Sequence, residues 1–191
     1  MITEYQGIIH KSRYARYLDS EGRRESWNET VNRYTNYMEW VLAGFSVGAF
    51  PKEVKEAILD MEVMPSMRAF MTADPDPGTG ALTRDHMAGY NCAYLAVDHI
   101  RAFDESIYVL LCGTGVGFSV ERQFISRLPE VAEEFHKSDT TIVVSDSKIG
   151  WAKALRELVS LLYQGMIPKV DYSRIREAGA RLKIFGGRAS G

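Results

Sequence analysis

Residues 91–120 read NCAYLAVDHIRAFDESIYVLLCGTGVGFSV, and this stretch decides the fold class. The short apolar run Cys92 to Val97 is typical of a buried strand. Asp104 is placed to cap a helix that ends at Gly113, and Val116 to Val120 predicts a second strand. The expected inner side of the helix is Ile107, Leu110 and Leu111. The order strand, helix, strand indicates an α/β protein.

The segment before this unit, up to about residue 62, is predicted to be helical. Ser26 and Glu29 have the spacing of a capping box at a helix start, and Gly44 and Gly48 suggest where that helix ends. Pro51 suits the first turn of a second, shorter helix. The expected inner faces are Trp27, Val31, Tyr34, Met38, Val41 and Leu42 in the first helix, and Val54, Ile58 and Met61 in the second.

The segment after this unit predicts a further strand and helix. Thr141 to Val144 is β-branched and favours a strand, and Asp146 or Ser147 can cap a long helix after it. Pro168 is expected to begin a connection to a last strand, Arg181 to Phe185. The inner side of the long helix is predicted to be Ile149, Ala152, Leu155, Leu158, Val159 and Leu162.

Composition excludes several classes of function. The 191 residues carry a net charge of −2 and no basic patch interleaved with aromatic residues, so nucleic acid is a poor partner. The longest apolar runs, such as Ile107 to Cys112, fall far short of the roughly 20 residues that span a membrane. The first residues lack the pattern of a secretory signal. Two cysteines do not suit a disulfide scaffold, and a reducing cytoplasm is the expected compartment.

The motifs that carry chemistry are weak when taken one by one. The glycines of 113–117 resemble a dinucleotide fingerprint, but that motif needs a strand before it and a helix after it, and here the predicted order is reversed. The four histidines are scattered, so no metal site is predicted. Cys92 has the greatest chemical potential, although a lone cysteine is more often a small buried hydrophobic residue. Two glycine-containing loops, 88–91 and 186–191, offer backbone amides to an anion.

The order of residues in several segments is more specific than their composition. In order along the chain, these segments are 12–17, 23–34, Met64 to Ala69, Asn91 with Cys92, 113–120, Ser145 to Trp151, Asp171 to Arg176 and 186–191. Together they resemble adenosylcobalamin-dependent ribonucleoside-triphosphate reductases, the monomeric class II type of ribonucleotide reductase. The chain departs from that pattern at Ile149, where an acidic residue is expected, and at Glu177, where a proline is expected. Both departures lie near the family's nucleotide-specificity region.

The resemblance implies a fold. The chain is expected to be an α/β protein, with an N-terminal helical region over 1–62 followed, over 63–191, by the first strands and helices of a reductase α/β barrel. The chain stops on a glycine-rich loop, and we therefore expect it to be the N-terminal fragment of a larger reductase. Its early strands would have unpaired edges in isolation, which favours poor solubility or a molten state.

The resemblance also implies a reaction. Homolysis of the cobalt–carbon bond of adenosylcobalamin leads to a thiyl radical on one cysteine, which abstracts the ribose 3′-hydrogen. Two further cysteines supply reducing equivalents as the 2′-hydroxyl leaves as water, and they end as a disulfide. Cys92 matches the first of these two, whereas Cys112 matches none of the required cysteines. We therefore expect this chain to be inactive without the C-terminal remainder of the reductase.

Further residues are matched to the family by position. Ser66 and Asn91 are candidates for binding the ribonucleoside triphosphate, and Asp98 is a candidate for binding a deoxynucleotide effector, although a solvated turn aspartate is the simpler reading of Asp98. The Gly-rich loop expected near substrate or effector contains Gly186, Gly187, Arg188 and Ser190. The expected reductant is of the thioredoxin type.

Three alternatives remain open on the sequence. The chain is a non-catalytic nucleotide-binding or assembly module, an inactive remnant, or a fragment of a reductase of another class, either the large subunit of a class I reductase or a class III reductase. A class I reductase would need a separate radical-generating subunit, and a class III reductase would need a glycyl-radical domain.

Overall fold

The computed structural model describes residues 2–76, 78, 80–182 and 188–189. They form two compact units, residues 1–89 with 181–188 and residues 90–180 with 189–191. The contacts within the chain thus divide it after Gly89. The boundary between residues 62 and 63, which the resemblance implies for the helical region and the barrel, stays a prediction. None of the helices in the described ranges is both long and apolar enough to cross a membrane.

The first unit is mainly helical. Its elements are α1 (Glu4–Arg13), β1 (Tyr17–Leu18), β2 (Arg23–Arg24), α2 (Trp27–Gly44), α3 (Lys52–Leu59), α4 (Met67–Thr72), α5 (Ala81–Arg84) and the 3₁₀ turn η1 (His86–Gly89). The strands β1 and β2 pair antiparallel as a small hairpin, which the sequence analysis did not predict.

Helix α2 forms the core of this unit and begins and ends as predicted. Ser26 and Glu29 make both hydrogen bonds of a capping box, and the helix ends at Gly44. The ring of Phe70, from α4, lies 5.4 Å from that of Trp27 and 5.0 Å from that of Tyr34. The predicted inner face of α3 is correct at Ile58, which is buried, but wrong at Val54, which is exposed.

A buried ion pair ties α2 to its neighbours. The Arg33 guanidinium donates to the Glu25 carboxylate at 2.8 Å and 2.9 Å, and also to the backbone carbonyls of Phe70 and Ala73 at 2.9 Å and 2.6 Å. Because these carbonyls lie at the end of α4, the one guanidinium satisfies both a buried carboxylate and an uncapped helix end.

The ion pair extends to a buried histidine on α1. The Thr30 hydroxyl donates to Glu25 at 2.9 Å, so the His10 Nε2 atom, 2.8 Å from the same hydroxyl oxygen, must be the donor to it. The Nε2 atom of His10 therefore carries a proton. Burial lowers the pKa of His10 below its ordinary value. Burial alone would raise the pKa of Glu25, but hydrogen bonds from Arg33 outweigh it and hold that pKa low.

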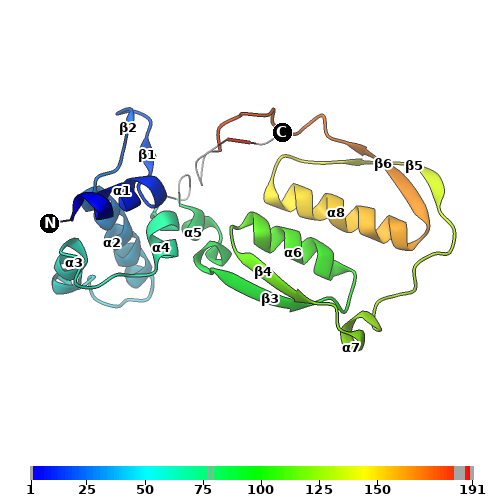
Figure 1. Ribbon diagram of the computed structural model, residues 1–191, viewed down its shortest axis with the longest axis horizontal. Coiled ribbons are helices and arrows are strands. Elements are labelled where there is room, and N and C mark those ends of the chain that lie inside the picture. The colour runs from blue at the N-terminus through cyan, green and yellow to red at the C-terminus, as the bar shows by residue number, and fades with distance from the viewer. Residues whose placement is uncertain (1, 77, 79, 183–187, 190–191) are drawn as a thin grey trace. The chain divides into compact units, whose positions relative to one another are not determined.

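The second unit contains two separate pairs of parallel strands, each with its own helix. Its elements are β3 (Cys92–Ala96), α6 (Arg101–Leu111), β4 (Gly115–Ser119), α7 (Arg122–Ile125), β5 (His136–Val143), α8 (Lys148–Tyr163) and β6 (Met166–Asp171). β3 pairs with β4 and β5 pairs with β6. Figure 1 shows α6 along the first pair and α8 along the second, with the two helices side by side. The predicted strand–helix–strand order of residues 91–120 is confirmed.

Several local predictions in this unit were wrong. Asp104 does not cap α6, because the helix begins at Arg101. Asp104 belongs to the first turn of the helix, and its buried side chain pairs with Arg156. Leu110, Leu111 and Ile149, predicted to face inward, are exposed. The run from Cys92 is a strand, but it is buried on one side only.

Pro168 does not begin a connection, because it lies within β6. It is tolerated there because the pairing with β5 shifts register between Lys137 and Thr141, beside the proline. The predicted last strand, 181–185, lies mostly outside the described residues; Arg181 forms an isolated antiparallel bridge with Arg188.

The entry to α8 is fixed by a tight cap. The Ser147 side chain accepts a hydrogen bond from the Gly150 amide at 3.0 Å, which confirms Ser147 as one of the two predicted caps. A Cβ atom on Gly150 would collide with the Ser145 carbonyl, so only glycine permits this turn.

We predict that the buried histidine makes the stability of the first unit depend on pH. Because the pKa of His10 is lowered in the folded chain, its contribution is complete above the unfolded pKa of 6.5 and is lost as the pH falls below that value. The free energy of unfolding should fall from pH 7.5 to 5.5, by less than about 1.4 kcal/mol per pH unit. Chemical unfolding followed by tryptophan fluorescence measures this. The variant His10→Gln, which keeps a donor but does not titrate, should flatten the slope; an unchanged slope would contradict the assignment.

A second prediction concerns the pair that joins α6 to α8. Both the Nε and Nη2 atoms of Arg156 donate to Asp104 Oδ2, at 2.9 Å and 2.5 Å, and the Asp104 side chain is 2% exposed. Arg156→Met leaves this buried carboxylate without its ionic partner and should lower the temperature of thermal unfolding. The double variant Asp104→Asn/Arg156→Met should recover part of that loss in thermal unfolding. Equal losses in both proteins would show that the carboxylate is not the cause.

Candidate functional site

Cys92 is the first residue of β3 and its side chain is exposed. Exposure alternates along the strand: Cys92 and Tyr94 face away from α6, whereas Ala93 and Leu95 are half-buried. Tyr94 is 67% exposed, so this side of β3 is an open apolar face that begins with a thiol. The prediction that a strand would carry Cys92 is confirmed, and the reading of it as a small buried hydrophobic residue is wrong.

The strand beside Cys92 leaves space next to the thiol. In the parallel register Cys92 lies opposite Gly115 and Tyr94 lies opposite Gly117. A Cβ atom on either glycine would meet no atom closer than 3.5 Å or 3.8 Å respectively, which is ordinary contact. Packing among the described residues therefore does not require glycine at Gly115 or Gly117. Because glycine has no side chain, these two residues form a flat strip of backbone on β4 beside the Cys92 thiol, which we call the glycine strip.

The two cysteines have different environments. Cys112 is fully buried at the end of α6, and the Lys148 ammonium from α8 lies 3.2 Å from its sulfur. The same ammonium lies 5.5 Å from the ring centre of Tyr108, which adds a cation–π contact. Cys112 is thus enclosed within the second unit, whereas Cys92 is open to a reaction partner.

Asn91, the residue before Cys92, is exposed and its backbone is held in place. The Gly115 amide donates to the Asn91 carbonyl at 2.9 Å. The amide side chain of Asn91 stands next to the thiol in sequence, as a substrate-binding role requires, although that role stays a prediction.

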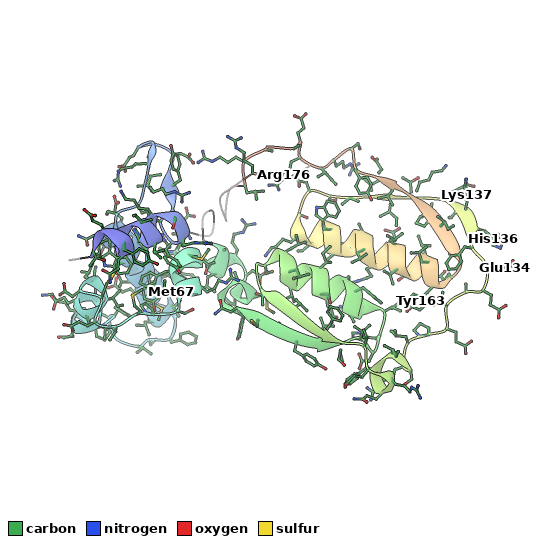
Figure 2. The ribbon with its side chains drawn as sticks, in the orientation of Figure 1. Met67, Glu134, His136, Lys137, Tyr163 and Arg176 are labelled. Carbon is green, nitrogen blue, oxygen red and sulfur yellow. The ribbon has the colours of Figure 1, made fainter. Side chains whose placement is uncertain are left out.

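Ser66 belongs to the first unit, and its place relative to Cys92 is not defined. It precedes Met67, the first residue of α4, which Figure 2 labels. Ser66 is exposed, and its side chain makes no capping hydrogen bond to the helix. A serine at a helix start whose hydroxyl is not used by the helix is suited to bind an anion, but only the complete site can test this.

Asp98 lies just beyond β3 and already has ionic partners. Its Oδ2 atom is 3.3 Å from Arg127 Nη1, and its Oδ1 atom is 3.7 Å from His99 Nδ1. The side chain is partly exposed. The proposed effector role and the simpler reading as a solvated aspartate both fit these contacts.

Sequence reasoning missed an ion pair between Arg176 and Asp146. Arg176, labelled in Figure 2, donates from Nε to both carboxylate oxygens of Asp146, at 3.0 Å and 2.8 Å. The pair links the loop after β6 to the start of α8. The two residues stand 30 positions apart, and no spacing rule connects them. Glu134 and His136, also labelled in Figure 2, form a similar but fully exposed pair at 3.5 Å.

Of the four residues predicted to form the Gly-rich loop, only Arg188 lies within the described residues. Gly186, Gly187 and Ser190 lie outside the described residues. Arg188 is exposed and bridges to Arg181. Within the ranges that the structure describes, no three His, Cys, Asp or Glu side chains are grouped so as to hold a metal ion.

Comparison with known proteins shows which proteins this chain is similar to. The chain matches no protein-family model. A protein of Mycobacterium phage D29, named provisionally as an adenosylcobalamin-dependent ribonucleoside-triphosphate reductase, is 25% identical over 96% of this chain and 30% of its own length. Reductases of the same name from Euglena gracilis and Lactobacillus leichmannii are 27% and 26% identical over 96% of this chain and 27% and 33% of theirs.

A solved structure shares the fold. The crystal structure of a B12-dependent class II ribonucleotide reductase superimposes with a TM-score of 0.76 at 23% identity, over 96% of this chain and 34% of that one. The expected fold, a helical region followed by the beginning of a reductase α/β barrel, is confirmed. The chain spans about a third of the length of the curated relatives that it matches. It is a homologue of one part of the adenosylcobalamin-dependent ribonucleoside-triphosphate reductases.

Proposed function

We propose that this chain is part of a ribonucleotide reductase and that Cys92 is one of the two thiols that reduce the ribose. The observation that carries the proposal is the position of Cys92. It is exposed at the start of β3, on the face of the strand that points away from α6. A thiol fixed on a strand holds its direction better than one on a loop, and the glycine strip beside it leaves room for a sugar.

The reduction that Cys92 performs balances with one further thiol. The ribose C2′–OH bond breaks, the hydroxyl leaves as water, and a C2′–H bond forms. Two thiols lose their hydrogens and become a disulfide, which supplies the two electrons. The second sulfur must bring its Cα within about 7 Å of that of Cys92. Cys112 is enclosed and bound to Lys148, so we assign the second thiol to the remainder of the protein.

Neither of two hollows among the described residues suits adenosylcobalamin. A hollow of about 400 Å³ between α6 and α8 is lined largely by charged side chains, including the Asp104–Arg156 pair. A second hollow, of about 430 Å³, lies beside Trp27 and α3 in the other unit from Cys92. We therefore derive no step through the cofactor and assign its contacts, and the generation of the thiyl radical, to the remainder of the protein.

The roles of the other candidate residues rest on the same proposal. Ser66 and Asn91 would bind a ribonucleoside triphosphate through hydroxyl and amide hydrogen bonds. Asp98 and the loop 186–191 would bind a deoxynucleotide effector or line the substrate site. A thioredoxin-type protein in the cytoplasm would regenerate the thiols.

The remainder is needed for structure as well as for chemistry. Among the residues that the structure describes, β3–β4 and β5–β6 are two-stranded sheets that share no ladder, so each has unpaired edges. The exposed Tyr94 and Phe118 add apolar surface on the two sides of the first pair. Two-stranded sheets are marginal unless they are packed or extended. We propose that further strands complete the barrel and that the isolated chain is inactive.

The test is to combine this chain with the remainder of the protein, adenosylcobalamin and a dithiol, and to measure deoxyribonucleotide formation. Cys92→Ser should reduce multiple turnover to below about a thousandth of the wild-type rate, because serine cannot form the disulfide.

The matched control is Cys112→Ala, which removes the other thiol and should leave turnover within about threefold of wild type. Undiminished multiple turnover by Cys92→Ser would refute the proposed role. Substantial turnover by the isolated chain would refute its dependence on the remainder.

A further inference from the structure

A buried threonine holds the backbone that leads into Cys92. Thr114, in the turn between α6 and β4, is 1% exposed, and its hydroxyl donates to the Tyr90 carbonyl at 2.8 Å. The next residue, Gly115, donates its amide to the Asn91 carbonyl at 2.9 Å. Two successive carbonyls just before the cysteine are therefore bound by Thr114, the last residue of the turn, and Gly115, the first residue of β4.

The hydroxyl supplies a donor that the backbone cannot provide. The Thr114 amide is turned back toward α6, where it donates to the Val109 carbonyl at 3.3 Å. Gly113, with a φ of 86°, makes this reversal possible. In a parallel ladder only alternate residues direct their amides to the partner strand, and Gly115 is the residue that does so here. The bond from the Thr114 hydroxyl to the Tyr90 carbonyl therefore holds this segment in addition to the β3–β4 ladder.

This contact matters because little else fixes the start of β3. The Tyr90 side chain is 62% exposed, and those of Asn91 and Cys92 are exposed as well. Their side chains are thus not held by packing against the second unit. The direction in which the Cys92 thiol points depends on its backbone, and the backbone depends on the bonds from Thr114 and Gly115.

We propose that Thr114 is a positioning residue for the redox cysteine, and this inference rests on the proposed function of Cys92. A disulfide forms only within a narrow range of Cα distance and direction. A displacement of about 1 Å at a reacting group can cost about a hundredfold in rate. Loss of the Thr114 hydroxyl frees the Tyr90 carbonyl and allows such a displacement without removing any reacting atom.

The experiment uses the reductase assembled from this chain and the remainder of the protein. Thr114→Val keeps the shape of the side chain and removes the hydroxyl; kcat should fall about 10- to 100-fold, while KM for a ribonucleoside triphosphate changes less than about threefold. The Cys92 disulfide should also become easier to reduce, by about tenfold in its exchange equilibrium with dithiothreitol. Thr114→Ser keeps the hydroxyl and should restore both values.

A matched control separates positioning from loss of stability. Thr35 is also fully buried and also donates its hydroxyl to a backbone carbonyl, that of Asn32 at 3.1 Å, but it lies in α2. Thr35→Val should leave kcat and the disulfide equilibrium unchanged.

Each outcome decides one claim. If Thr114→Val turns over like wild type, or if Thr114→Ser is as slow as Thr114→Val, the positioning role is refuted. If Cys92→Ser keeps full turnover, the proposed function itself fails. The two failures are therefore distinguishable.

Discussion

The parallel pairing of β3 with β4 is the constraint on which the candidate site depends. Parallel neighbours cannot be joined by a tight turn, so the chain must return through a crossover, here α6. That crossover covers one side of the pair and leaves the other side open. Cys92 and Tyr94 point to the open side, and the register sets two glycines beside them. Exposure of the thiol thus follows from topology and not from a loop that projects it.

Helix caps and helix faces were predictable from the sequence because they depend on residues a few positions apart. The Ser26–Glu29 capping box, the end of α2 at Gly44 and the Ser147 cap of α8 are examples. The predictions failed where distant residues decide. Asp104 was read as a cap because a carboxylate suits a helix start, but Arg156, 52 positions away, draws it into the interface between α6 and α8. Pro168 was expected to begin a connection, whereas it lies within β6, where the shifted register of the pairing with β5 accommodates it.

The candidate site was predictable to a different degree for each residue. The strand that carries Cys92 could be found from its apolar run, but the exposure of its thiol could not, because an apolar run does not reveal which side is covered. The Asp146–Arg176 and Lys148–Cys112 contacts join residues more than 25 positions apart, beyond any local spacing rule. Ser66 lies in a different compact unit from Cys92, so its role stays an expectation of the family resemblance alone.

The two parallel pairs also bear on how the polypeptide reaches this fold. Cys92 meets Gly115 after 23 residues (115 − 92), and His136 meets Met166 after 30 (166 − 136). Contacts of such short sequence separation carry a modest loop-closure entropy and favour rapid folding. Each strand–helix–strand half can therefore assemble early, while the polypeptide is still leaving the ribosome. If further strands complete the barrel, as proposed above, their pairing with the open edges joins residues of larger sequence separation and should be slower than the assembly of either half.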